Sequence, residues 1–173
     1  MHDSAYNDAK NFVDKYLSSK KGQILRIADV GSYDVNGTLK ALFQASDWTN
    51  WALRDWSYTG FDIEFGPNVD VVLKSEYGWS TEYSKKYDVV VTTQVMEHVR
   101  KPWLWIKDIA EICKSGGLIY ICTPCGGVAL HEFPIDCWRT WPEGMRAVLE
   151  EVDVDVLDVY TQGEDTTGIA RKR

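Results

Sequence analysis

The chain has no uninterrupted apolar run that approaches the roughly 20 residues needed to cross a bilayer. The first residues, with Asp3, Asn7, Asp8 and Lys10 among them, also lack the charged-then-apolar pattern of a secretion signal, so none is expected. The sequence contains only four cysteines, which do not suggest a disulfide framework. We therefore expect a cytoplasmic protein with reduced thiols and no membrane partner.

Positive charge is also in short supply. The chain has 19 lysines and arginines against 26 aspartates and glutamates, and its formal net charge is -7. Because a general grip on phosphate backbones requires basic side chains, a nucleic-acid partner is not expected. Hydrophobic residues make up 45% of the 173 residues, which is typical of a globular chain and predicts a single domain spanning 1–173. Nothing in the sequence indicates an oligomeric state.

What the chain does have is an alternation of short apolar runs and amphipathic stretches. It predicts strands at 24–30, 58–63, 69–73, 87–93, 118–122, 152–160 and 166–170, and helices at 6–17, 37–45, 102–113 and 142–151. Trp103 and Ile106 are expected to begin the apolar stripe of the third helix, and Gly116 and Gly117 to close it. The alternation predicts a three-layer α/β sandwich, in which helices cover both faces of a mostly parallel sheet and the last strand is antiparallel.

Ligands of such sheets bind at the carboxyl ends of the strands. The first strand ends in Asp29, Gly31 permits a tight turn, and Ser32 follows. Taken alone, this is equally well an ordinary turn into a helix. Tyr33 stands where a dinucleotide fingerprint has its second glycine, and no Gly-Lys-Ser/Thr phosphate loop follows. The pattern therefore predicts neither a dinucleotide site nor a phosphate loop.

The next predicted strand ends in Asp62 and Ile63. A carboxylate at this position can accept hydrogen bonds from two ribose hydroxyls, with an apolar surface beside it for a purine, although a solvated aspartate is the simpler interpretation. Together with the turn at Asp29, Asp62 forms the arrangement that binds an adenosyl group. We expect both carboxylates to face one shared cavity.

The segment from Tyr87 to Val99, with the sequence YDVVVTTQVMEHV, completes a resemblance to the class I S-adenosylmethionine-dependent methyltransferases, which extends from about Ile24 to about Glu151. The resemblance implies a Rossmann-like fold, S-adenosylmethionine as the cofactor, and methyl transfer as the activity. It also implies a set of cofactor-binding residues: Asp29, Gly31, Ser32, Asn36, Asp62, Ile63, Thr93 and Gln94. Tyr33 replaces a usually small residue, and we expect it to crowd the methionyl end or to reshape the loop.

The later segment from His131 to Met145 is similar to a bacterial and phage subset of these methyltransferases, whose members often lie among glycan-modifying enzymes. We expect a small-molecule or glycan-type acceptor. A base that removes the acceptor's proton would assist transfer, and the candidates are His98, His131 and Asp136. The candidate substrate contacts are Glu97, His131, Trp138 and Arg139.

Simpler roles exist for several of these residues. His98 would bond only backbone groups, Trp138 would belong to the core, and Arg139 would pair with Asp136. Cys122, Cys125, His131 and Cys137 contain the spacing of a zinc site, but Cys122 is expected to point into the sheet, and no metal is predicted. Two alternative functions also remain open: a catalytically inactive or regulatory adenosyl-binding module, and another reaction of the same cofactor.

Overall fold

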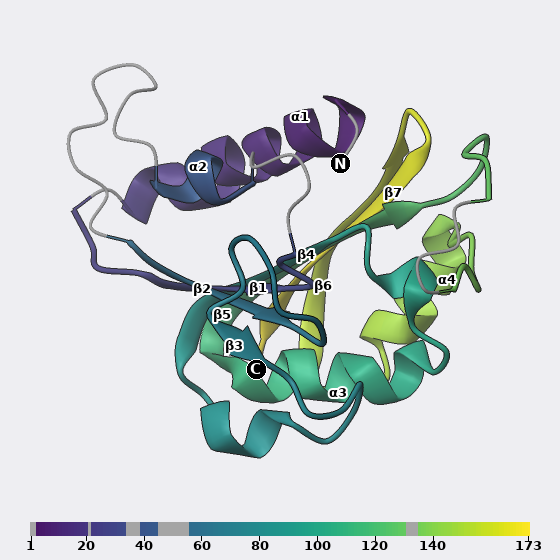
Figure 1. The fold of residues 1–173 in the computed structure, drawn as a ribbon. Coiled ribbons are helices and arrows are strands. Elements are labelled where there is room, and N and C mark those ends of the chain that lie inside the picture. Colours follow the sequence, from purple (N-terminus) through teal and green to yellow (C-terminus); the bar gives the residue numbers. More distant parts are fainter. Residues whose placement is uncertain (1–2, 21, 34–38, 45–55, 131–134) are drawn as a thin grey trace.

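The computed structural model describes residues 3–20, 22–33, 39–44, 56–130 and 135–173 (Figure 1). Strands and helices alternate along most of the chain. In order, the elements are α1 (Asp3–Phe12), β1 (Arg26–Val30), α2 (Leu39–Gln44), β2 (Ser57–Asp62), β3 (Val71–Val72), β4 (Tyr87–Thr93), α3 (Pro102–Ile112), β5 (Cys113–Pro124), α4 (Pro142–Leu149), β6 (Val154–Gln162) and β7 (Asp165–Lys172). None of the helices in these ranges is long and apolar enough to cross a membrane.

The strands form one sheet in the order β3-β2-β1-β4-β5-β7-β6. The neighbouring pairs from β3 to β5 are parallel, whereas β7 runs antiparallel to both β5 and β6. This confirms the predicted mostly parallel α/β sandwich with an antiparallel last strand. The strand order reverses between β1 and β4, so the carboxyl ends of these two central strands form the expected ligand edge.

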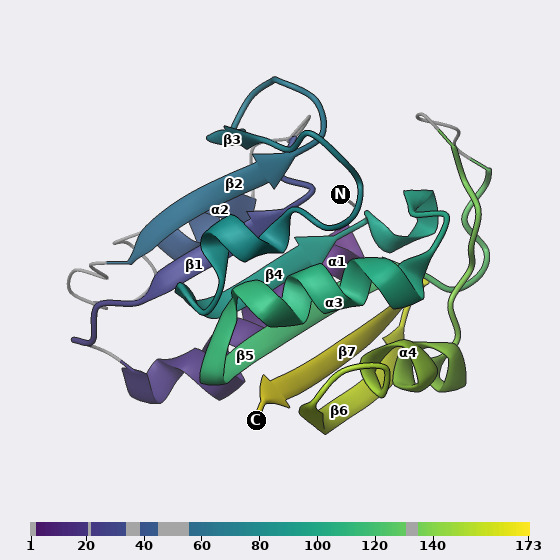
Figure 2. The same cartoon turned by 90° about the horizontal axis from the view of Figure 1, so that it is seen from below.

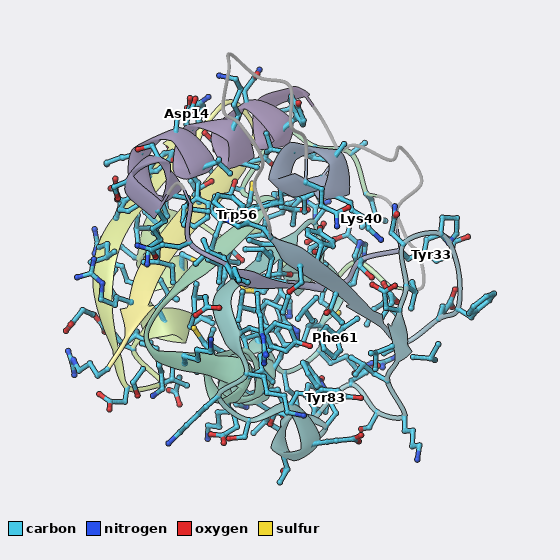
Figure 3. The ribbon with its side chains drawn as sticks, turned by 90° about the vertical axis from the view of Figure 1, so that its left-hand side faces the viewer. Asp14, Tyr33, Lys40, Trp56, Phe61 and Tyr83 are labelled. Atoms are coloured by element: carbon cyan, nitrogen blue, oxygen red, sulfur yellow. The ribbon has the colours of Figure 1, made fainter. Side chains whose placement is uncertain are left out.

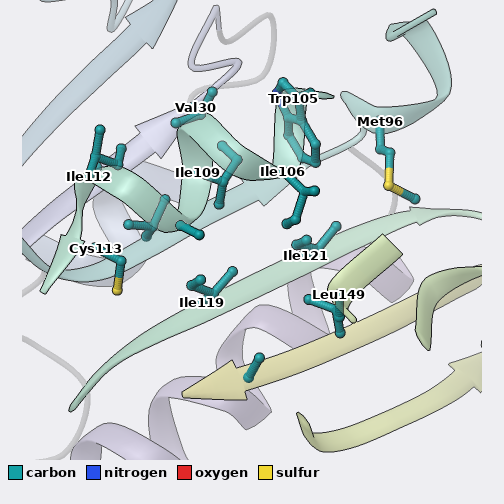
Figure 4. Packing of buried hydrophobic residues seen from close by; sticks show 14 of the residues in the cluster. Val30, Met96, Trp105, Ile106, Ile109, Ile112, Cys113, Ile119, Ile121 and Leu149 are labelled. Carbon is teal, nitrogen blue, oxygen red and sulfur yellow. The ribbon is translucent and has the colours of Figure 1, made fainter. Parts of the chain in front are cut away.

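Helices cover both faces of the sheet, α1 and α2 on one side and α3 and α4 on the other (Figures 1 and 2). The central strand β4 shows why: Val89 and Val91 pack in the cluster under α1 and α2, and Val90 packs in the cluster over α3 and α4. In the second cluster, Ile106 and Ile109 of α3 lie against the sheet (Figure 4). Burying one such side chain contributes about 1.5–3 kcal/mol, so this strand is fixed from both sides.

Two local expectations about α3 were wrong. Trp103 does not join the buried stripe but is half exposed, and Trp105 takes the buried position instead. The glycines do not close the helix: Cys113 already pairs with Tyr87, and the ladder resumes only at Leu118, so residues 114–117 form a bulge inside β5.

The strand expected at 69–73 is only two residues long. Asp70 replaces ladder contacts with its side chain, because its carboxylate accepts the backbone N–H of Gly60 at 2.8 Å. The backbone N–H of Asp70 also donates to the carbonyl of Gly60, at 2.9 Å. This edge of the sheet is therefore held by one aspartate as much as by a strand.

Candidate active site

The turn after β1 begins with a buried acid and a glycine that no other residue can replace without strain. Asp29 accepts a hydrogen bond from the Tyr58 hydroxyl at 2.6 Å, which links β1 to β2. Gly31 has a φ of +83°, in the region that favours glycine. A Cβ placed on Gly31 would lie only 2.0 Å from Cγ2 of Val95, so the turn packs directly against the segment that follows β4.

The turn also carries a feature that suits a bound ligand. The hydroxyl oxygen of Ser32 is buried and has no hydrogen-bond partner among the described residues. Buried polar atoms are normally paired, and the exceptions often lie at functional sites or beside an absent ligand or water. At Gly31 the space of a side chain is filled by Val95, so this glycine holds the turn against the segment after β4. The turn therefore fits the cofactor implied by the sequence resemblance.

Asp62 is held in place at the end of β2. One of its carboxylate oxygens accepts the N–H of Tyr33 at 2.9 Å, and the other accepts the N–H of Glu64 at 3.1 Å. Because a carboxylate can accept about four hydrogen bonds, each oxygen keeps capacity for a ligand hydroxyl. Ile63 beside it is 43% exposed and offers an apolar surface.

The predicted pair of carboxylates occupies adjacent strands. Asp29 lies opposite Gly60 in the β1–β2 register, so Asp62 stands two residues further toward the carboxyl edge. Side chains alternate along a strand, which puts Asp29, Tyr58 and Asp62 on the face covered by α1 and α2. Asp29 is deep in the sheet and Asp62 is at its rim. A cavity shared by the two carboxylates stays a prediction.

The third strand end is Thr93–Gln94. Gln94 has a φ of 56°, unusual for a residue with a side chain, and its N–H donates to the carbonyl of Cys122 at 2.8 Å. Its side-chain amide donates to Asp165 at 2.9 Å. Asp165 is fully buried at the start of β7 and also accepts the hydroxyl of Ser4 in α1, at 2.7 Å. Two fixed hydrogen bonds thus determine both the backbone and the amide of Gln94.

Sequence reasoning missed Asp165. An acid directly before the β-branched pair Thr166–Thr167 is a weak signal, because a solvated strand start has the same pattern. Asp8, in α1, lies near Asp165; it is fully buried and accepts a hydrogen bond from the hydroxyl of Thr167 at 2.9 Å. Burial raises the pKa of Asp8, with the nearby Asp165 carboxylate contributing in the same direction. The first turns of α1 are thus fastened to β7 by buried acids.

Glu97 and His98 lie in the short 3₁₀ turn Met96–His98 that follows β4. The Glu97 carboxylate is fully buried and accepts the hydroxyl of Thr123 at 3.0 Å. His98 contacts the carbonyl of Ile135 through Nδ1, and its Nε2 lies 3.6 Å from Glu97. Both ring nitrogens of His98 face acceptors. This geometry favours the simpler role, in which His98 bonds to neighbouring groups, over the role of a free base.

The segment after residue 134 is tied down by these residues and by one ion pair. Asp136, whose side chain is 1% exposed, receives two hydrogen bonds from Arg139, one of them at 2.7 Å. This hydrogen bonding raises the pKa of Arg139. Both oxygens of Asp136 are therefore occupied, and the pairing that was the simpler alternative for Arg139 is the arrangement found.

Trp138 is neither core nor free. Its Nε1 donates to the carbonyl of Val99 at 2.8 Å, and its ring meets Trp103 edge to face at 6.5 Å between centroids. The indole is still 40% exposed, so it presents a surface to any molecule that enters beside this segment.

The described residues thus bring together two groups of predicted site residues. The first comprises the β1 turn, Asp62 and Gln94 at the carboxyl ends of three neighbouring strands. The second comprises Glu97, His98 and the 135–139 segment. Asn36 and His131 lie outside the described residues.

The zinc alternative concerns the second group. Within the described ranges, no cluster of three or more His, Cys, Asp or Glu side chains could hold a metal ion. Cys122 is buried in the cluster under α1, as expected, and burial raises the pKa of its thiol, which disfavours the thiolate that a metal needs. Cys137, by contrast, is exposed.

A family model described as a methyltransferase domain matches residues 16–151. Two curated relatives share the printed name ubiquinone biosynthesis O-methyltransferase. The protein from Parvibaculum lavamentivorans is 27% identical over 93 residues, which is 49% of this chain and 37% of the relative. The protein from Saccharophagus degradans is 33% identical over 61 residues, which is 35% of this chain and 26% of the relative. The chain therefore spans well under half the length of these relatives.

Several solved structures share the fold. The trans-methyltransferase CalH, in complex with S-adenosylhomocysteine, has a TM-score of 0.69 at 17% identity, covering 97% of this chain and 58% of CalH. An S-adenosylmethionine-dependent methyltransferase from Aquifex aeolicus has a TM-score of 0.62 at 11% identity, covering 95% and 97%. The (4+2)-cyclase SpnF has a TM-score of 0.71 at 12% identity, covering 96% and 81%. At these identities the likeness concerns the fold alone.

Proposed function

Because the chain belongs to the methyltransferase-domain family, we propose that it binds S-adenosylmethionine and transfers the methyl group to a small-molecule or glycan-type acceptor. The proposal rests on one observation: the carboxyl ends of β1, β2 and β4 lie side by side at the point where the strand order reverses. There Asp62 accepts the N–H of Tyr33, and Gly31 packs against Val95. When bound, the cofactor supplies a methyl group on a positively charged sulfonium.

The residues of the chain would hold this cofactor in a defined order. Gly31 and Ser32 would meet the methionyl part, since the Ser32 hydroxyl is buried without a described partner and Gly31 holds this turn against Val95. Asp62 would accept the ribose hydroxyls, with Ile63 against the purine. Gln94, fixed by Asp165, would lie on the side of the transferred group. Asp29, deeper in the sheet, would support the turn from below.

The acceptor side is the anchored segment 135–139. His98 and Asp136 are engaged in its anchoring, so we assign them to positioning rather than to proton transfer. His131 stays the predicted base. Alignment of acceptor and methyl group is itself worth about 7–11 kcal/mol in well-oriented reactions, so transfer to a reactive oxygen or nitrogen does not require a strong base. The name of the curated relatives and the net charge of -7 both support a small-molecule or glycan-type acceptor over a nucleic acid.

The first test is calorimetric titration of the purified chain with S-adenosylmethionine and S-adenosylhomocysteine. Both should bind at one site. Asp62→Ala should weaken each by about tenfold or more, because it removes an ionised acceptor of hydroxyl groups. Asp14→Ala, which changes an exposed aspartate near the end of the first helical segment, is the control and should bind as the wild type does. Lack of binding by the wild type would refute the proposal.

The second test separates methyl transfer from other uses of the same site. Incubation with methyl-labelled cofactor and an extract of small molecules should yield S-adenosylhomocysteine together with a labelled acceptor. The fold alone does not decide the reaction, as the structural likeness to a cyclase illustrates. His98 contacts a carbonyl and Asp136 is paired with Arg139, so neither is available as a base. This observation favours the non-catalytic alternative. Cofactor binding without any labelled product would support that alternative.

A further inference from the structure

The ring of Tyr33 packs against a neighbouring loop, and its expected crowding of the methionyl end stays a prediction. The ring lies against Gly66, in the loop that joins β2 to β3 (Tyr33 is labelled in Figure 3). A Cβ placed on Gly66 in that loop would lie 1.9 Å from Cε2 and 2.3 Å from Cδ2 of the Tyr33 ring. The ring therefore covers the backbone of Gly66 directly, and only a glycine leaves room for it.

The same residue holds the carboxylate beside the ring. The backbone N–H of Tyr33 donates to Asp62 at 2.9 Å, so the ring and the Asp62 carboxylate belong to one connected unit. One side of the ring is covered by Gly66, yet Tyr33 is still 40% exposed. Ile63, exposed to 43%, continues the apolar surface next to Asp62. A nucleoside bound through its ribose at Asp62 would thus find an open aromatic ring next to the sugar.

We propose that Tyr33 is a binding residue for the nucleoside half of the cofactor, with Gly66 as the support that sets the position of its ring. The inference rests on the proposed function, because it takes the ligand at Asp62 to be an adenosyl group. Stacking of an aromatic side chain on a base or sugar tolerates no large shift of the ring. A side chain at Gly66 would push the Tyr33 ring out of place, so we expect Gly66 to affect binding only through Tyr33.

The experiment uses two probes, S-adenosylhomocysteine and 5′-methylthioadenosine, which share the nucleoside but differ at the amino-acid end. Calorimetric titrations of the full chain should show that Tyr33→Ala weakens both by the same factor, about fivefold or more, as expected for a lost aromatic stack. Tyr33→Phe keeps the ring and should bind both probes nearly as well as the wild type. Thermal unfolding of each variant checks that the fold is intact.

Gly66→Ala gives the second, independent arm. It should weaken both probes in the wild-type background, because the added methyl group displaces the ring, and it should have no further effect in the Tyr33→Ala background. Unchanged affinity of Tyr33→Ala would overturn the inference. So would a loss confined to S-adenosylhomocysteine, which would place the ring at the methionyl end, or an equal effect of Gly66→Ala in both backgrounds. If the wild type binds neither probe, the proposed function fails first and the inference fails with it.

Discussion

The contact between Gly31 and Val95 joins the turn after β1 to the segment after β4. Replacing Gly31 with alanine has two separate costs, and both can be estimated from the structure. An alanine at the φ of Gly31, +83°, costs about 1–2 kcal/mol in backbone strain. Its Cβ would also overlap Cγ2 of Val95 at 2.0 Å, and overpacking of this kind costs about 1–3 kcal/mol. Gly31→Ala should therefore destabilise the protein by about 2–5 kcal/mol, a large part of a typical domain's total stability.

The chain contains a matched control for the strain alone. Gly22 has a φ of +77°, and nothing lies within 4 Å of a Cβ placed on it, so Gly22→Ala should cost only about 1–2 kcal/mol. Urea denaturation gives both free energies of unfolding. In a Val95→Ala background the overlapping methyl group is gone, and the cost of Gly31→Ala should fall toward that of Gly22→Ala. The reasoning is refuted if Gly31→Ala costs no more than Gly22→Ala, or if Val95→Ala leaves its cost unchanged.

Two further outcomes concern a buried carboxylate and the unequal exposure of two cysteines. Asp108→Ala should lower the free energy of unfolding by about 2–4 kcal/mol, because the N–H groups of Gly78 and Ser80 lose the carboxylate that accepts them at 2.8 and 3.1 Å. Asp108→Asn keeps one acceptor and should cost less. Equal costs of the two substitutions would contradict this. In a thiol-reagent assay at about pH 8, Cys137 should react rapidly. Cys113 should react only after denaturation, because burial raises the pKa of its thiol to about 12 and the reactive thiolate does not form in the folded state; rapid reaction of Cys113 in the native protein would contradict this.

The sheet was predictable because the residues of its central strands are apolar on both faces, which itself indicates that the strands are buried. The run Tyr87–Thr93 is apolar and β-branched on both faces, which suits only a strand covered by helices on both sides. Short connections and right-handed crossovers then leave few ways to order such strands. The place of Asp62 at the rim was predictable for the same reason, since a carboxyl edge follows from strand direction, whereas Asp29 lies deeper in the sheet. Asp62 lies at this edge, where the pattern put it.

Side-chain partners were not predictable in the same way. Gln94 and Asp165 are 71 residues apart, and no local pattern links an amide after one strand to an acid at the start of another. Trp103 meets Trp138, which comes from a segment that follows a different strand, and no local pattern predicts this contact. Such contacts are set by the assembled fold. Residues two apart on a helix point in nearly opposite directions, so periodicity does separate the two tryptophans: Trp105 shares the buried stripe of Ile106 and Ile109, and the expectation placed Trp103 there by mistake.

The two halves of the candidate site are built differently, and this explains why the cofactor is easier to infer than the acceptor. On the cofactor side, the geometry depends on particular residue types: Gly31 admits no side chain, and Asp62 is aligned by the N–H of Tyr33. On the acceptor side, side chains fasten the segment: the ring of His98 contacts the carbonyl of Ile135, and Trp138 donates to the carbonyl of Val99 at 2.8 Å. These contacts fix where the segment lies but do not select the chemistry of an acceptor, because the surface that Trp138 leaves exposed can meet many small molecules.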